Sequence, residues 1–78
     1  MKIILADGSQ YIGNDANELV VQLKLEDWTS HNNIDAYKQN MKRRVKIFNG
    51  QKIKYTNDME FLQELKRIGF ILEIAVDN

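Results

Sequence analysis

Apolar residues recur along this chain with two different spacings, in segments that follow one another, and this pattern limits the folds that the chain can adopt. Strands carry apolar residues at every second position, whereas amphipathic helices carry them every three or four residues. The 78 residues contain four short strand-like segments and three longer helical ones. Their order, β-β-α-α-β-α-β, predicts a single small α+β domain over residues 1–78, with a mostly antiparallel sheet and helices packed on it.

The first two strand-like segments, 2–5 and 10–13, flank Asp7-Gly8, which is typical of a two-residue hairpin turn. Such a turn pairs Ile4 with Tyr11 and Ile3 with Ile12. Both faces of the hairpin then carry apolar side chains. Because a chain of this size has a small core, a homodimer is compatible with the sequence, and its expected contact is the exposed side of the hairpin around Ile4 and Tyr11.

Two helical segments begin with a capping box, in which a cap residue and a glutamate three positions later bond each other's backbone. Asp15 with Glu18 predicts the start of the first helix, which is expected to end near residues 25–28. Asn57 with Glu60 predicts the start of the third helix. The residues expected to face the core are Ala16, Leu19, Val20 and Leu23 in the first helix, and Met59, Phe61, Leu62, Leu65 and Ile68 in the third.

The middle helical segment is expected to begin after Asn32 or Asn33 and to end at Asn49-Gly50, with glycine in the left-handed conformation. Asn-Gly is also a hairpin turn, which would make strands of residues 44–48 and 51–55. That hairpin places an apolar residue opposite a polar one in every pair, whereas the helical period is unbroken. The sequence therefore favours the helix. The residues expected on its core side are Ile34, Tyr37, Met41, Val45 and Phe48.

The last two strand-like segments differ in character. Residues 52–55 alternate between lysine and apolar side chains, which predicts a short edge strand with Lys52 and Lys54 outward. Residues 70–76 are almost continuously apolar, which predicts a central strand covered on both faces.

The residue types needed for catalysis or metal binding are scarce. The chain has no cysteine and one histidine, His31, which lies in the polar segment between the first two predicted helices. No phosphate-loop, calcium-loop or nucleophile-turn motif occurs, and Glu26-Asp27 is more typical of a solvated helix end than of a metal site. We therefore expect no enzymatic activity, no metal site and no cofactor. Trp28 is expected either in the core or as an anchor for a protein partner.

Basic residues are concentrated in the middle of the chain. Seven of the eleven Lys and Arg residues lie between positions 36 and 55, a stretch without Asp or Glu, although the formal net charge of the chain is 0. On a helix, residues four apart share one face, which predicts a basic ridge. This ridge either complements the acidic ends of the other helices or binds an anionic partner. The expected partner-binding residues are Lys38, Lys42, Arg43 and Lys46 on the ridge, with Lys52 and Lys54 alongside.

The apolar runs of the sequence are short. None reaches the length needed to span a bilayer, and no signal-peptide pattern follows Met1. We expect a cytoplasmic protein without a membrane partner.

A set of core, cap and turn residues runs through most of the chain: residues 4–8 (Ile-Leu-Ala-Asp-Gly), Glu18-Leu19-Val20, Trp28, Tyr37, Met41, Arg44-Val45, Asn49-Gly50, residues 59–62 (Met-Glu-Phe-Leu), Leu65 and Gly69-Phe70-Ile71. In these residues the chain resembles small uncharacterised proteins of bacterial phages and prophages, the type that includes anti-CRISPR and other anti-defence proteins. The resemblance implies an inhibitor or adaptor that binds a protein or nucleoprotein machine of a bacterial host. The alternative is a nucleic-acid-binding module that uses the basic ridge.

Overall fold

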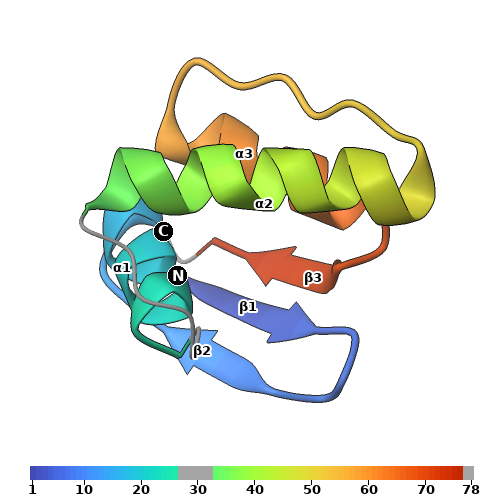
Figure 1. Ribbon diagram of the computed structural model, residues 1–78. Coiled ribbons are helices and arrows are strands. Elements are labelled where there is room, and N and C mark those ends of the chain that lie inside the picture. The colour runs from blue at the N-terminus through green and yellow to red at the C-terminus, as the bar shows by residue number, and fades with distance from the viewer. Residues whose placement is uncertain (27–32, 77–78) are drawn as a thin grey trace.

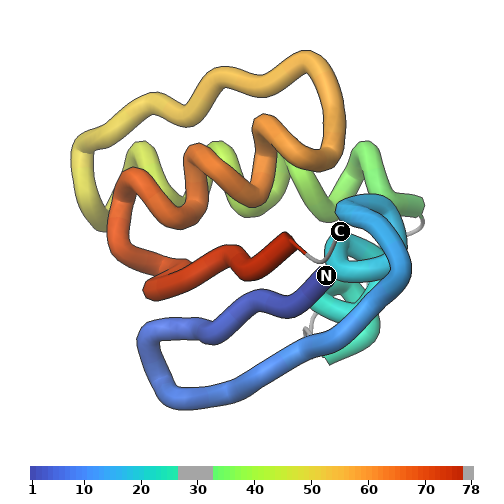
Figure 2. The backbone as a smooth tube through the Cα atoms, turned by 180° about the vertical axis from the view of Figure 1, so that it is seen from behind, coloured from blue at the N-terminus to red at the C-terminus, as the bar shows by residue number. Residues whose placement is uncertain are grey.

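The computed structural model describes residues 1–26 and 33–76 and confirms the α+β class (Figure 1). Its strands form one antiparallel sheet in the order β2-β1-β3. Helices α2 and α3 lie on the β3 side of this sheet, and β2 is the strand farthest from them (Figures 1 and 2). Trp28 and His31 lie outside the described residues. The elements are β1 (Lys2–Leu5), β2 (Gln10–Ile12), α1 (Ala16–Glu26), α2 (Ile34–Asn49), α3 (Asp58–Arg67) and β3 (Ile71–Ala75).

The predicted hairpin forms, but its predicted register is wrong by one residue. Leu5 N–H donates to the Ser9 carbonyl at 2.8 Å, so the loop has three residues, and Gly8 takes a φ of +92° at its third position. The observed register therefore pairs Ile3 with Tyr11 and Ile4 with Gln10. A one-residue shift moves every side chain to the opposite face. Tyr11 packs against the core, and the expected joint surface of Ile4 and Tyr11 does not exist.

The prediction of a central C-terminal strand is also wrong, because β1 is the central strand and β3 lies at an edge. The register of β3 shifts between Ile4, which pairs with Glu73, and Leu5, which pairs with Ile71. Leu72 is therefore an extra residue on β3, and it is 59 % exposed. The core accepts only part of the apolar run, because Phe70 and Val76 are exposed as well.

All three helices begin as predicted. The side chains of Asp15, Asn33 and Asn57 each accept a hydrogen bond from the backbone N–H three residues later, at 2.9, 2.8 and 2.8 Å. These bonds satisfy N–H groups that the helix itself leaves without a partner.

Helix α2 ends at the predicted glycine, and Gly50 has a φ of +69° and donates its N–H to the Lys46 carbonyl at 3.0 Å. The hairpin alternative is thereby excluded. The predicted core stripe holds through Tyr37, Met41 and Val45, which are buried, but not at Phe48, which is 79 % exposed. The last turn of α2 extends past the core, and the aromatic side chain stays at the surface.

Residues 52–55 are not a strand of the sheet, contrary to the prediction. The expected alternation is nevertheless present, because Ile53 is 0 % exposed whereas Lys52 and Lys54 are exposed. A period of two residues reports which side chains are buried, and it does not report which backbone groups pair. We call this segment, residues 51–55, the connector.

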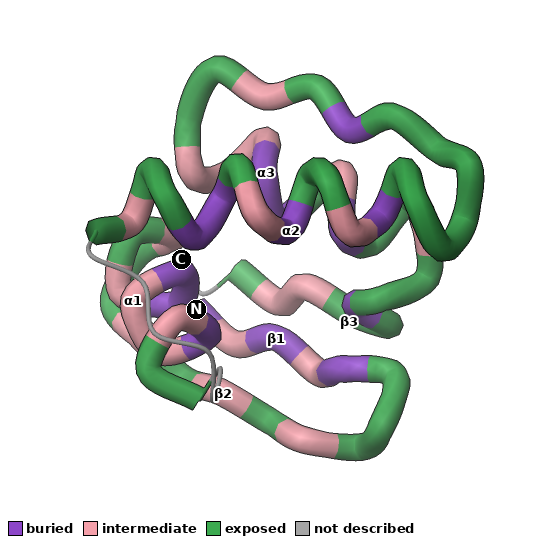
Figure 3. The backbone as a smooth tube through the Cα atoms, viewed as in Figure 1, coloured by how far each residue is buried: buried purple, intermediate pink, exposed green. Residues whose placement is uncertain are grey.

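The core lies where the inner sides of the sheet, the helices and the connector meet (Figure 3). Its side chains include Ile3 and Leu5 from β1, Leu19, Val20 and Leu23 from α1, Tyr37, Met41 and Val45 from α2, Ile53 from the connector, Phe61, Leu62 and Leu65 from α3, and Ile71 from β3. Every described element except β2 therefore buries at least one large apolar side chain.

Candidate anion-binding site

The structure gathers four of the six predicted site residues around one hollow. Helix α2 contributes Lys42 and Lys46, and the connector contributes Lys52 and Lys54. The hollow has a volume of about 360 Å³, and Ile53 also lines it. We call this site the lysine hollow.

Local structure explains the convergence. Lys42 and Lys46 are four residues apart on α2 and therefore share one face of the helix. Lys52 and Lys54 flank Ile53, whose burial in the core turns both lysines to the exposed side of the connector. Among residues 1–26 and 33–76, no Asp or Glu side chain lines the hollow, and the lining residues are cationic or apolar.

Arg43 extends the basic surface beyond the lysine hollow. It is exposed and borders a shallow depression on the outer side of α2, together with Lys42 and Lys46. Five of the predicted site residues thus form one continuous basic surface, which bends from the outer side of α2 into the hollow.

Lys38 is the exception, and its expected place on the exposed ridge is wrong. The residue is only 7 % exposed, and its ammonium group forms an ion pair with Asp58 at the start of α3. The ammonium also lies 5.5 Å from the ring centroid of Tyr55 and 5.8 Å from that of Phe61. Tyr55 at the end of the connector and Phe61 of α3 thus cover the first lysine of the ridge, and its charge is used within the fold.

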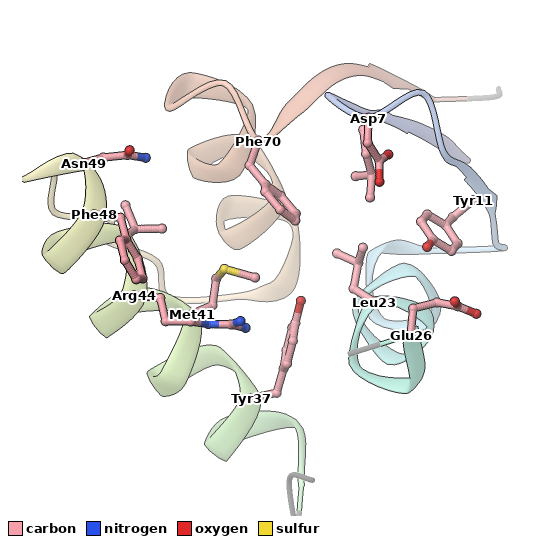
Figure 4. A pocket seen from close by; sticks show the side chains of 12 residues that line it. Asp7, Tyr11, Leu23, Glu26, Tyr37, Met41, Arg44, Phe48, Asn49 and Phe70 are labelled. Atoms are coloured by element: carbon pink, nitrogen blue, oxygen red, sulfur yellow. The ribbon is translucent and has the colours of Figure 1, made fainter. Parts of the chain in front are cut away.

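A second surface feature lies beside α2 and was not foreseen from the sequence. It is an open groove of about 420 Å³ between α2, α1, the β1–β2 hairpin and the turn before β3 (Figure 4). We call it the apolar groove, and its lining includes Leu5, Tyr11, Leu23, Met41, Phe48 and Phe70. These residues are far apart in the sequence, and only the assembled fold brings them together.

The charges at the apolar groove are mixed. Burial raises the pKa of Tyr11, and the negative charges of Glu26 and Asp7 raise it further. Arg44 lines the groove from α2 (Figure 4). The groove therefore combines an apolar lining with charges of both signs, unlike the lysine hollow.

The described residues define a small α+β domain with a lysine-lined hollow on one side of a helix. They contain no group of three or more His, Asp or Glu side chains placed to hold a metal ion. No helix in the described part of the chain is long and apolar enough to cross a membrane. Comparisons of the chain with protein-family models, with curated proteins and with solved structures found no match.

Proposed function

We propose that this protein is a non-enzymatic binding protein that holds phosphate groups of a nucleic acid in its lysine hollow. The supporting observation is the convergence of four lysines, from two separate segments, on one hollow without a carboxylate in its lining. Four like charges around one hollow repel one another, so the arrangement favours a bound anion. Each phosphate that a lysine neutralises also releases condensed counterions, which adds to the affinity.

The expected binding is strongly salt-dependent and weakly sequence-dependent, because lysine contacts with phosphates carry no base information. The test measures the affinity of the full chain for labelled duplex and single-stranded DNA across a salt series. Lys42→Gln/Lys52→Gln removes two cations of the hollow. Its matched control is Lys24→Gln/Lys66→Gln, which removes two cations that do not line the hollow.

We expect the hollow variant to bind more weakly and to lower the slope of log affinity against log salt by about 0.9 per lost duplex contact, or about 0.7 on a single strand. The control variant should keep the slope of the unmodified protein. A flat salt response of the unmodified protein, or equal losses in both variants, would remove the proposal.

The apolar groove supports a second candidate function, an inhibitor or adaptor of the phage type that binds a host protein or nucleoprotein machine in the bacterial cytoplasm. Exposed aromatic side chains such as Phe48 are enriched where proteins bind one another. If the partner is a nucleoprotein, the lysine hollow would contact its RNA and the groove its protein.

A capture experiment separates the two candidates. The immobilised chain and its Phe48→Gln/Phe70→Gln variant are exposed to bacterial lysate with and without nuclease. A protein retained after nuclease by the unmodified chain, and lost by the groove variant, supports the inhibitor or adaptor. Capture that disappears with nuclease in both cases leaves nucleic-acid binding as the function.

A further inference from the structure

The connector lacks the sheet hydrogen bonds that would fix a strand, yet it carries half of the lysine hollow. Its backbone is instead bonded by two side chains of α3. Glu64 Oε1 accepts a hydrogen bond from Lys54 N–H at 3.0 Å, and Arg67 Nη2 donates to the Lys52 carbonyl at 2.7 Å. These two bonds lie on either side of Ile53.

Glu64 and Arg67 also fix each other. Arg67 Nε donates to Glu64 Oε2 at 2.7 Å, and Arg67 Nη2 donates to Glu64 Oε1 at 3.2 Å. A third contact runs from Arg67 Nη1 to Gln51 Oε1 at 3.2 Å. The two-pronged pair uses the planar geometry of the guanidinium group, which a lysine cannot reproduce. We call Glu64 and Arg67 the α3 clamp.

We propose that the α3 clamp positions Lys52 and Lys54 for phosphate binding in the lysine hollow. The inference rests on the proposed nucleic-acid binding, and it assigns a role to two residues that do not line the hollow themselves. The four lysines carry like charges, which favour a wider separation of the connector from α2, and the two clamp bonds hold the connector backbone from the α3 side. The lysines are then in place before the ligand arrives, so less ordering entropy is lost on binding.

The central variant is Arg67→Lys, which keeps the positive charge and removes the two-pronged geometry. Lys66→Arg is the matched control, since it exchanges one cation for another at the neighbouring exposed position. Binding to a labelled DNA duplex across a salt series measures the contacts. Amide exchange of Lys54 N–H, followed by NMR, reports on the clamp without any ligand.

We expect Arg67→Lys to speed Lys54 amide exchange and to weaken duplex binding at every salt concentration, because Lys52 and Lys54 must then be ordered during binding. The salt slope should change little, since both lysines can still contact phosphates. In a Lys52→Ala/Lys54→Ala background the same substitution should change the affinity no further, because the lysines it positions are gone. A general loss of folding would instead weaken binding in both backgrounds. Lys66→Arg should leave affinity and exchange unchanged.

The results separate the inference from the proposed function. If the unmodified chain does not bind DNA, the proposed function fails and the clamp has no binding role. If the unmodified chain binds and Arg67→Lys keeps its affinity, the function stands and the inference is overturned. Unchanged exchange of Lys54 N–H in Arg67→Lys overturns it as well.

Discussion

At the scale of single residues, Asp58 is the point at which three helices meet. One of its carboxylate oxygens bonds the Lys38 ammonium from α2, and the other accepts Asn17 Nδ2 from α1 at 3.0 Å. The side chains of Lys38 and Asp58 are 9 % and 22 % exposed. Removal of one partner from such a pair leaves a charge with little access to water, which is costly.

We expect Asp58→Asn to lower the free energy of unfolding by about 3 kcal/mol, at the low end for a buried pair because Asp58 retains some exposure. Lys38→Met should cost less, because the more exposed carboxylate is then the charge left behind. Urea unfolding measures both. The double variant should cost less than the sum of the single ones, and additive losses would show that the pair does not couple.

Asp58 also predicts how stability depends on pH. Burial raises the pKa of Asp58, but the hydrogen bonds from Lys38 and Asn17 outweigh it and lower the pKa below its ordinary value of 3.8. A carboxyl group with a lowered pKa in the folded state stabilises the fold above its unfolded pKa, and this contribution disappears as pH falls through the folded value.

The stability difference between the unmodified chain and Asp58→Asn should therefore be constant near neutral pH and shrink as the pH falls below about 3.8. Urea midpoints measured along a pH series provide the check. A difference that stays constant through this acidic range would assign the effect of Asp58→Asn to packing, not to charge.

At the scale of elements, the end of α2 depends on one glycine. Gly50 has a φ of +69°, and a Cβ atom built there meets no other atom within 4 Å. Gly50→Ala should therefore lower the free energy of unfolding by about 1 kcal/mol through backbone conformation alone. Gly50→Asn should cost less, since asparagine tolerates the left-handed region better. Equal losses in thermal or urea unfolding would contradict this explanation.

Signals within one element were sufficient to predict the helices. Caps such as Asn57 and Gly50, and apolar residues three or four apart, act over one or two turns and appear directly in the sequence. The errors in the predicted strands have another origin. Hairpin register depended on whether the loop begins at Ala6 or at Asp7, and the place of β3 in the sheet depended on partners distant in the sequence.

The candidate site, like the fold, was predictable only as far as signals within single elements reach. The spacing of Lys42 and Lys46 and the alternation around Ile53 correctly predicted four exposed lysines, although the strand expected for Lys52 and Lys54 does not form. Their convergence required the path of the connector, which α3 side chains determine. The burial of Lys38 was missed for the same reason, because its partner Asp58 is twenty residues away.

At the scale of the whole molecule, α2 separates two surfaces of different chemistry. Successive helix residues are about 100° apart around the axis, so residues two positions apart point in nearly opposite directions. Lys46 borders the lysine hollow, and Phe48 borders the apolar groove. The hollow and the groove share no lining residue, so we expect that a ligand in one leaves the other open.

Phe48→Gln tests this separation. The side chain is 79 % exposed, so we expect its loss to change the free energy of unfolding by less than about 0.5 kcal/mol and to leave DNA affinity unchanged. Lys46→Gln should weaken DNA binding at similar stability. Equal effects of the two substitutions on DNA affinity would show that hollow and groove act as one site.

The sheet order has a kinetic consequence as well. The β1–β2 hairpin closes over three residues, and hairpins form in about 1–10 µs. The β1–β3 ladder instead joins Lys2 to Ala75, so its closure must gather nearly the whole chain first. We expect the ladder to form after the rate-limiting barrier. In stopped-flow experiments, Ile74→Ala should accelerate unfolding while leaving the refolding rate nearly unchanged. In that case β3 is the last strand to dock and the first to detach. Each time β3 detaches, β1 becomes an open edge of the sheet.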